Sequence, residues 1–287
     1  MSLAPIALFA YKRLEHTRLT VEALLRNELA SESRLFVFSD GPKSSKEDME
    51  VDAVRQYLGS VTGFKSIELV CRSRNLGLAD SIISGVTSLC GRFGRLIIVE
   101  DDLETSPFFL RYMNEALDLY ERTPEVISIH GYVYPVSESL PETFFIRGAD
   151  CWGWATWQRG WSLFEPDGMQ LLNELESRRL SEEFDFDGAA GYTTMLRQQI
   201  AGNVNSWAIR WYASAFLAGK LTLYPGRSLV RNIGLDASGT HCGQNTELDV
   251  RLSDRSIALE RLDPVEHPGA RAAIRGFFLG ARDVAQM

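Results

Sequence analysis

Three consecutive acidic residues, Glu100, Asp101 and Asp102, directly follow an apolar run at 96–99. The run has the length and composition of a buried strand, which places the carboxylates at its carboxyl end. Like charges so close together repel one another and lose hydration. Either the run turns into solvent, or a strongly cationic group lies beside it. Carboxylate oxygens suit Mg²⁺ or Mn²⁺ with phosphate oxygens as further ligands, so we expect a divalent cation that neutralises a diphosphate leaving group.

Apolar runs alternate with helical patterns in the first half of the chain. The helical patterns cover 15–29, 46–58, 79–90 and 107–121, and in the last of these Ser106 can cap a helix that begins at Pro107. Such alternation predicts an α/β fold whose mainly parallel sheet is flanked by helices, with ligands bound beyond the carboxyl ends of the strands. The predicted strands are 5–11, 34–39, 66–71, 95–100 and 126–130.

Two more polar segments stand at carboxyl ends of predicted strands. Tyr11, Lys12 and Arg13 follow the first strand, and Asp40 follows the second. Neither the GxGxxG loop of a dinucleotide-binding dehydrogenase nor a P-loop is present, and the glycine-rich basic loop usual in a nucleotidyltransferase is also missing. The pattern fits a nucleoside diphosphate whose base contacts Tyr11 and Arg13, and whose uracil or ribose donates to Asp40.

Composition narrows the class of protein. The chain has 287 residues and a net charge of −8, so nucleic acid is not an expected partner. It contains neither an apolar run of eighteen residues nor a basic-then-apolar leader. Its four cysteines lack zinc or CxxC spacing, which is typical of reduced thiols. We therefore expect a cytoplasmic protein.

The second half of the chain differs in character. All six tryptophans lie between 152 and 211, and an acidic, helical stretch is expected at 170–187. A glycine-rich segment covers 232–243, and 268–284 reads as a helix. No repeat or linker is visible. We expect one continuous domain over 1–287, with a nucleotide-binding half at 1–135, a sugar and acceptor half at 136–250, and a C-terminal extension at 251–287.

The order of motifs over roughly 4–245 resembles that of GT-A-type glycosyltransferases, in particular the N-acetylglucosaminyltransferase I-like group and its bacterial relatives. The most specific part is VEDDLETSPFF, followed about fifty residues later by CWGW. The other matching segments are PIALFAYKR, FVFSDGPK, RSRNLGLADSI, ISIHGYVYP and SLVRNIGLDASGTHCG. The resemblance implies a nucleotide-diphospho-sugar transferase with a GT-A fold, a UDP-sugar donor and Mn²⁺ or Mg²⁺ as cofactor.

The resemblance also implies roles for residues at the acidic run. Asp102 becomes the metal ligand, Asp101 the ribose contact and Glu100 the sugar contact. Asp40 matches an aspartate that binds uracil, and Arg13 matches an arginine that contacts the base. The residues expected to bind the nucleotide on this basis are Ala10, Tyr11, Arg13, Asp40, Arg74 and Asn75.

A late loop is expected to close over the diphosphate in such enzymes. His241 occupies it here and is predicted to bind the metal or a phosphate, against the alternative of a surface histidine. Gly234, Gly239 and Gly243 favour a mobile lid. Arg227 and Arg231 are candidates for pairing with phosphate, although surface arginines are common.

The tryptophan-rich segment has two interpretations. Tryptophans most often fill cores, yet four of them in eleven residues are dense for packing alone. Because this segment aligns with the donor-sugar and acceptor site of the resembled family, Trp152, Gly153 and Trp154 are predicted to contact sugar. Asp150 is a candidate for hydrogen bonds to sugar hydroxyls, and His130 points to the same cleft or is a core residue.

The general base is the weakest match to the family. An inverting transfer needs a group that takes the proton of the acceptor hydroxyl, and the family uses an aspartate where this chain has Asn205 and Ser206. Asp236 and Asp150 are the predicted catalytic acids, with Asp185 or Asp187 as alternatives. A retaining transfer, or none, also remains open.

The sequence thus predicts a transferase that moves a sugar from a UDP-sugar to a glycan or lipid-linked acceptor in bacterial surface polysaccharide or glycan synthesis. The alternatives are a metal-dependent nucleotidyltransferase and a glycan- or nucleotide-binding module without catalysis. The C-terminal helix carries Arg271, Arg275 and Arg282 near Phe277 and Phe278, which would suit either peripheral contact with the inner membrane or simple packing.

Overall fold

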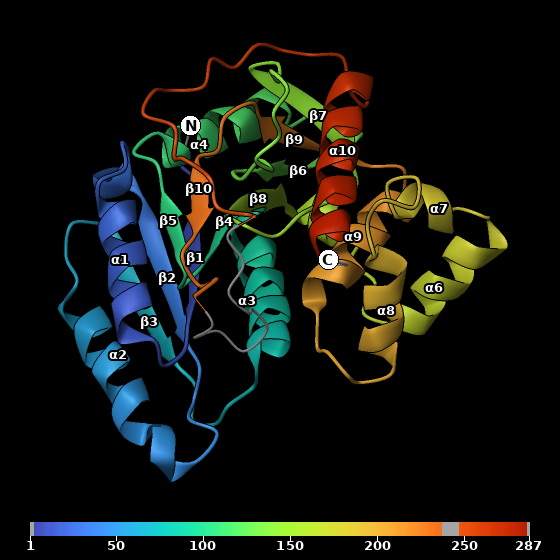
Figure 1. Cartoon of the computed structure of the whole chain (residues 1–287). Helices are drawn as coiled ribbons and strands as arrows, with labels where there is room; N and C mark the ends of the chain where they lie inside the picture. The colour runs from blue at the N-terminus through green and yellow to red at the C-terminus, as the bar shows by residue number, and fades with distance from the viewer. Residues whose placement is uncertain (1–2, 237–246, 286–287) are drawn as a thin grey trace.

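The computed structural model describes residues 3–236 and 247–285, and it contains an eight-stranded sheet in the order β3-β2-β1-β4-β8-β6-β9-β7 (Figure 1). Strands from both halves of the chain join this sheet. Their bounds are β1 (Ile6–Ala10), β2 (Arg34–Ser39), β3 (Ser66–Cys71), β4 (Arg95–Glu100), β6 (Val126–His130), β7 (Thr143–Arg147), β8 (Trp154–Trp157) and β9 (Leu221–Pro225).

The sheet is mixed. β3, β2, β1 and β4 run parallel to one another, and β6 is parallel to β9. β8 is antiparallel to both of its neighbours, β4 and β6, and β7 is antiparallel to β9. The predicted α/β class with a mainly parallel sheet flanked by helices is therefore confirmed. All five predicted strands are present.

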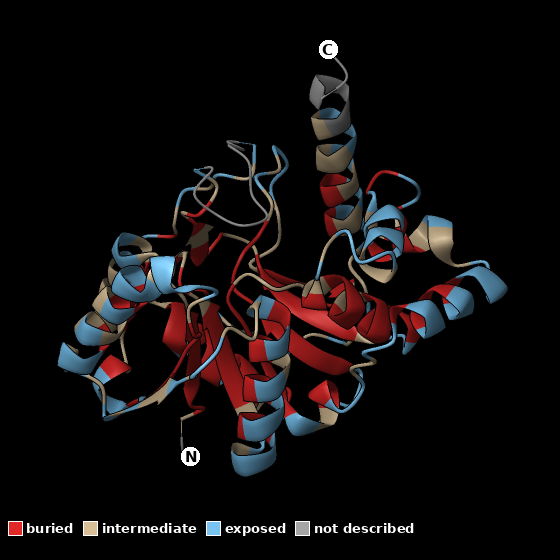
Figure 2. Cartoon of the chain, turned by 90° about the horizontal axis from the view of Figure 1, so that it is seen from below, coloured by how far each residue is buried: buried red, intermediate tan, exposed pale blue. Residues whose placement is uncertain are grey.

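Both faces of the sheet are covered, because alternate residues of each strand point to opposite sides. On β1, Ile6 and Leu8 face a core shared with α1, α2 and α4, whereas Ala7 and Phe9 face a core shared with α3 and α9. Figure 2 shows the strands buried between the more exposed outer faces of the helices. These helices are α1 (Leu14–Leu25), α2 (Asp48–Ser60), α3 (Leu78–Phe93), α4 (Phe109–Leu119) and α9 (Trp207–Leu217).

Several predicted helices differ from their expected bounds; the one expected at 15–29, for example, ends at Leu25. The stretch at 170–187 is broken into α6 (Gly168–Ser177) and α7 (Ser181–Phe184), with Arg179 between them at a φ of 57°. Helix α4 begins at Phe109 rather than at Pro107, because its first hydrogen bond of α-helical spacing runs from the N–H of Tyr112 to the carbonyl of Phe108. The Ser106 hydroxyl accepts from the N–H of Phe108 at 3.4 Å and donates to the carbonyl of Ser253 at 2.8 Å. The remaining short elements are η1 (Ala30–Glu32), η2 (Ser45–Glu47), α5 (Gln158–Trp161) and α8 (Tyr192–Ile200).

A small second sheet lies beside the acidic run. β5 (Leu103–Thr105) pairs antiparallel with β10 (Val230–Asn232), so that Asn232 lies opposite Leu103. Just beyond the pair, the N–H of Ile233 donates to the carbonyl oxygen of Asp102 at 2.8 Å. A segment 130 residues further along the chain is thereby held against the predicted metal ligand.

Most of the tryptophans belong to the core. Trp154 on β8 is fully buried and stacks on Trp207 at a ring-centroid distance of 5.4 Å, and Trp211 lies 5.7 Å away. Trp161 lies 5.3 Å from Trp211. The prediction that Trp154 contacts sugar is therefore wrong: its ring has no exposed face.

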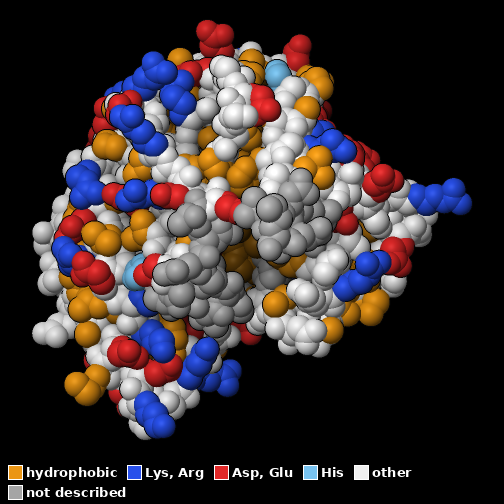
Figure 3. All heavy atoms as spheres, in the orientation of Figure 1, with side chains coloured by type: hydrophobic (Ala, Val, Ile, Leu, Met, Phe, Trp, Pro, Cys, Tyr) orange, Lys and Arg blue, Asp and Glu red, His pale blue; other side chains and the backbone are white. Residues whose placement is uncertain are grey.

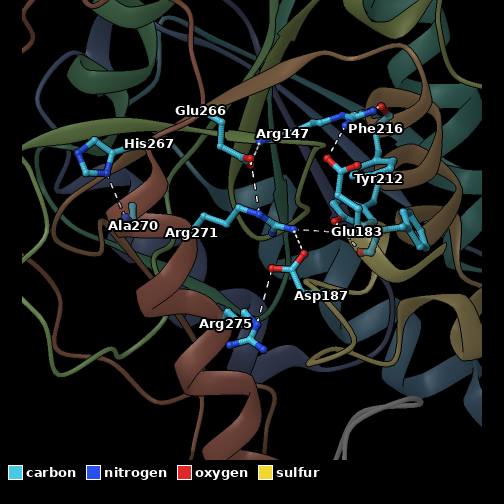
Figure 4. A network of polar contacts seen from close by, with 11 residues as sticks. Arg147, Glu183, Asp187, Tyr212, Phe216, Glu266, His267, Ala270, Arg271 and Arg275 are labelled. Carbon is cyan, nitrogen blue, oxygen red and sulfur yellow. Dashed lines mark hydrogen bonds and ion pairs between the residues drawn. The ribbon is translucent and has the colours of Figure 1, made fainter. Parts of the chain in front are cut away.

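The C-terminal helix α10 (Pro268–Ala285) packs on the second half of the chain. Arg271 pairs with Asp187 at 2.9 Å and with Glu266 at 3.7 Å, and Arg275 pairs with Asp187 at 3.7 Å (Figure 4). Phe278 contacts Tyr134 and Tyr192. These contacts fit the simple packing interpretation, and membrane contact stays a prediction. Within 3–236 and 247–285, no helix has the length and apolar character needed to span a bilayer.

Candidate functional site

Arg13 joins the ends of two neighbouring strands. It follows β1, and its Nη2 donates to Asp101 Oδ1 at 2.9 Å and to Asp102 Oδ2 at 2.7 Å, directly after β4. β1 and β4 are adjacent and parallel, so their carboxyl ends meet at one edge, as the sequence predicts. The cationic group that the acidic run requires is therefore provided, at least in part, by Arg13 of the chain itself.

Asp101 is held on every side. Its Oδ2 accepts from the N–H of Tyr11 at 3.2 Å, and its carbonyl accepts from the hydroxyl of Thr20 at 2.9 Å. Burial and the neighbouring Asp102 raise the pKa of this carboxyl, while Arg13 opposes the rise. Burial raises the pKa of Glu100 well above its usual range, and the charges of Asp102 and Asp101 add to that effect.

Asp102 fits a cation that is shared with phosphate. Its side chain is 15% exposed, and a Cβ on Gly234 would collide with its Oδ2, so the backbone at 234 closely limits where the carboxylate lies. Within 3–236 and 247–285, no cluster of three or more His, Cys, Asp or Glu side chains could hold a metal alone. One carboxylate completed by phosphate oxygens is a usual arrangement for Mg²⁺. His241, Gly239 and Gly243 lie outside the described residues.

Asp40 holds two loops together. Its Oδ1 accepts from the N–H groups of Gly41 and Leu76, and its Oδ2 accepts from the N–H of Gly77, each at 2.9 Å. Asn75 Nδ2 donates to the carbonyl of Gly41 at 2.8 Å. Asp40 and Asn75, both predicted to contact nucleotide, therefore fix the loops that follow β2 and β3.

The other predicted nucleotide residues lie at the same edge. Ala10 is buried at the end of β1, and its carbonyl accepts from the N–H of Asp40 at 2.9 Å. The Tyr11 hydroxyl donates to Glu47, and burial together with this carboxylate raises the pKa of Tyr11 to about 12. The side chain of Arg74 is exposed. Of these residues, Arg74 has the freest access to a ligand.

Asp150 lies among tyrosines. Its Oδ2 accepts from the hydroxyl of Tyr134 at 3.0 Å and lies 3.5 Å from that of Tyr224, and its Oδ1 accepts from the N–H of Cys151. The Tyr134 hydroxyl also lies 3.3 Å from that of Tyr192 on α8. The carboxylate is thus fixed by neutral donors, since burial and Asp150 raise the pKa of Tyr134 well above its usual range.

Cys151 lies in the short segment between Asp150 and β8. Burial raises the pKa of its thiol well above the usual range, and the charges of Asp150, Glu100 and Asp102 raise it further. Trp154, the first residue of β8, lies opposite Ile98 of β4, and the two strands are antiparallel, so the segment just before β8 lies at the carboxyl end of β4. The structure therefore brings Asp150 and the acidic run to one region of the molecule.

The segment between Asp150 and β8 is shaped by its backbone. Trp152 is half-buried against Tyr132, and its N–H donates to Nε2 of His130 at 3.1 Å. Gly153 has a φ of 63° and is buried, and a Cβ there would collide with Val230. Burial lowers the pKa of His130, which is fully buried. Of residues 152–154, Trp152 keeps an exposed surface.

Asp236 contacts helix α1. Its Oδ2 is 3.2 Å from Nε2 of His16 on α1, close to the chain segment that contacts Asp102. The two alternative acids serve the fold: Asp185 accepts from the N–H of Thr193 at 2.7 Å, and Asp187 pairs with α10. Ser206, at the position expected for the family base, caps α9.

Arg227 and Arg231 are both engaged by carboxylates. Arg227 forms two hydrogen bonds of 2.7 Å with Glu142, and Arg231 donates to Glu104 at 2.6 Å. This differs from the predicted pairing with phosphate. On the face drawn in Figure 3, Lys and Arg lie interspersed with Asp and Glu, and hydrophobic side chains line a hollow near its centre.

Tyr134 also lines a separate hollow of about 510 Å³. The hollow lies between the segment after β6 and residues 249–255, and Arg251 and Arg255 contribute to its wall. Sequence reasoning missed Tyr134, Tyr192 and His16. For Tyr134 a signal existed, because it follows the end of β6 as Tyr11 follows β1.

Comparison with known proteins gives limited overlap. No family model matches the chain, and no curated protein does. Several solved structures share part of it, of which three are described. The mannosyltransferase PcManGT from Pyrobaculum calidifontis, in complex with GDP-Man and Mn²⁺, is 12% identical over 46% of this chain, with a TM-score of 0.34. TarS 1–349 of S. aureus is 8% identical over 55%, with a TM-score of 0.35.

The third is a protein assigned as a nucleotide-diphospho-sugar transferase from Desulfovibrio desulfuricans G20. It is 11% identical over 58% of this chain, with a TM-score of 0.37. The matched regions span 36%, 48% and 69% of the three proteins in turn. The function proposed below rests on residues of the chain itself.

Proposed function

We propose that this protein is a GT-A-type glycosyltransferase that moves a sugar from a UDP-sugar to a glycan or glycolipid acceptor. The observation that carries the proposal is the meeting of the acidic run with Arg13 at the carboxyl edge of the sheet, next to Asp150 and Trp152. Ligands of such sheets bind at this edge. The motif order, VEDD followed by CWGW, supports the same activity.

Each group in this region has a role in the proposal. Asp102 would hold Mn²⁺ or Mg²⁺ together with phosphate oxygens, and the bound cation would supply positive charge to a diphosphate leaving group. In this proposal Asp101 would contact the ribose and Glu100 the donor sugar, the roles that the family resemblance implies. The loops after β2 and β3, which Asp40 and Asn75 fix, would bind the base and ribose of the nucleotide together with Arg74.

Asp150 is the proposed general base. An inverting transfer requires an acid–base group near the acceptor hydroxyl, and Asp150 is held in one orientation by Tyr134 while remaining partly exposed. Asp236 pairs with His16 on α1, so we propose that it fixes the segment after β10 against α1. The hollow beside Tyr134 is the proposed acceptor entrance, and Trp152 offers a ring face to sugar.

The test is a thermal-shift and hydrolysis screen of UDP-sugars and GDP-sugars with and without Mn²⁺. A donor that raises the melting temperature only with Mn²⁺ and is slowly hydrolysed supports the transferase. Asp102→Asn should abolish both effects. Asp118→Asn is the matched control, because Asp118 pairs with Arg95 at the opposite edge of the sheet.

Two results would contradict the proposal. Glycan binding without donor hydrolysis, unchanged in Asp102→Asn, would indicate a binding module. Release of pyrophosphate from a nucleoside triphosphate and a sugar phosphate would indicate a nucleotidyltransferase.

A further inference from the structure

We propose that Arg13 occupies the cation position between Asp101 and Asp102 in the nucleotide-free protein, so that a divalent cation binds there tightly only together with a nucleoside diphosphate. This inference rests on the proposed function for the identity of the ligand. It concerns a residue whose family-implied role is contact with the base, and it gives that residue a different role.

The guanidinium is delivered from a fixed backbone. Arg13 immediately precedes α1, and its carbonyl accepts from the N–H of Thr17 at 3.0 Å and from the Thr17 hydroxyl at 2.8 Å. One turn further along α1, Thr20 donates to the carbonyl of Asp101. Both ends of the ion pair are therefore attached to the same helix, which favours a single arrangement of the guanidinium.

Charge explains why a metal alone would bind poorly. Two carboxylates with one guanidinium carry a net charge of −1 when all three are ionised. A divalent cation added beside Arg13 would meet a like charge within a few ångströms, in a partly buried site where screening is weak. A diphosphate brings the negative charge that lets both cations remain.

Arg13 also has a group ready for phosphate. Its Nη1 is buried and has no hydrogen-bond partner among the described residues, whereas its Nη2 contacts both carboxylates. An unpaired buried donor is unfavourable until an acceptor arrives. Guanidinium groups match phosphate oxygens well. Nucleotide binding would thus satisfy Nη1 while it weakens the hold of Nη2 on Asp102.

The test measures Mn²⁺ affinity by electron paramagnetic resonance of the free ion, on the full chain. Wild type should bind Mn²⁺ alone at least about tenfold more weakly than it does with saturating UDP or GDP, once the Mn²⁺ held by the nucleotide itself has been subtracted with a titration that lacks protein. Arg13→Gln should bind Mn²⁺ alone at least about tenfold more tightly than wild type, because the competing charge is gone. Adding Asp102→Asn to Arg13→Gln should remove that gain.

Arg18→Gln is the matched control, since Arg18 lies on the same helix and also pairs with two carboxylates, Glu15 and Glu22, at an exposed site. It should leave Mn²⁺ affinity unchanged. If Arg13→Gln does not fold, Arg13→Lys serves instead, because lysine keeps the charge without a fork that spans both carboxylates. It should give an intermediate affinity.

Two outcomes would overturn the inference. One is tight binding of Mn²⁺ to wild type without nucleotide. The other is a folded Arg13→Gln protein whose Mn²⁺ affinity equals that of wild type. Because neither measurement needs a donor sugar or an acceptor, failure of the proposed transferase activity would be recognised separately.

Discussion

Tyr134 donates its hydroxyl hydrogen to Asp150 Oδ2 at 3.0 Å, and this bond distinguishes Asp150 from the other acids that the sequence offers as a base. Asp236 contacts His16, Asp185 contacts a backbone N–H, and Asp187 pairs with two arginines. The contacts of Asp150 include the neutral hydroxyl groups of Tyr134 and Tyr224, and on this ground we assign the general base to it.

We expect Asp150→Asn to lower the rate of sugar transfer by about 10²–10⁴-fold, the usual range for a lost general base. The dissociation constant for the nucleotide should change little, because the contacts at Asp101 and Asp102 are intact. Steady-state kinetics with a donor found by the screen, together with calorimetric binding of UDP, will separate the two effects.

Asp236→Asn is the comparison for this prediction, and it should alter the transfer rate by only a few-fold. Tyr134→Phe keeps the ring contact with Phe278 but removes the donor to Asp150. It should reduce kcat by roughly tenfold, because Asp150 loses a hydrogen-bond donor that fixes its orientation. If Asp236→Asn abolished sugar transfer while Asp150→Asn remained active, Asp236 and not Asp150 would be the general base.

The sequence predicts the strands of the nucleotide half well, because β1, β2 and β4 each contain a continuous apolar run. It does not predict β8, since Trp154–Trp157 follows a glycine and reads as a ligand surface. Whether Trp154 lies in the core depends on Trp207 and Trp211, which are more than fifty residues away. The antiparallel placement of β8 between β4 and β6 also depends on residues outside its own stretch of sequence, because both partner strands come earlier in the chain.

The acidic run illustrates the same limit within the site. Its position at a strand end follows from local apolar pattern, and the expectation of a cation beside it follows from charge. That Arg13 supplies a cation depends on how α1 begins, and Arg13 lies 88 residues from Asp101. Likewise, the carboxylate of Asp40 meets backbone donors 36 and 37 residues away.

Trp152 and Trp154 provide a direct contrast between sugar contact and packing. Trp154→Ala should destabilise the protein by about 3–5 kcal/mol, because it removes a fully buried ring from the tryptophan group. Trp152→Ala should cost clearly less stability but weaken donor-sugar or acceptor binding. Urea unfolding and the KM for both substrates are the measurements. If KM for both substrates were unchanged in Trp152→Ala, Trp152 would not contact the donor sugar or the acceptor.

His130 should make the protein less stable in acid. Burial lowers its pKa from the usual 6.5 although the charge of Asp150 opposes the shift, and its ring packs edge-on against Tyr132 and Tyr224. As pH falls below 6.5, His130 is therefore protonated in the unfolded chain while it stays neutral in the folded protein. The stability of the folded protein is full above pH 6.5 and decreases as pH falls.

His130→Gln keeps an acceptor for the N–H of Trp152 but cannot gain charge. Its stability deficit relative to wild type should narrow by up to about 1.4 kcal/mol per pH unit below about pH 6.5. Unfolding free energies measured from pH 8 to pH 5 will show this. A constant difference across that range would contradict the assignment.

Asp40→Ala should act on stability and nucleotide binding together. The substitution leaves the N–H groups of Gly41, Leu76 and Gly77 without their carboxylate. We expect a loss of at least about 2 kcal/mol in the free energy of unfolding, with protection of these amides from hydrogen exchange falling first. Asp80→Ala is a suitable control, because Asp80 is exposed on the first turn of α3 directly after the same loop. If Asp40→Ala weakened UDP binding while stability and amide protection matched the control, the carboxylate would serve the base directly rather than the loops.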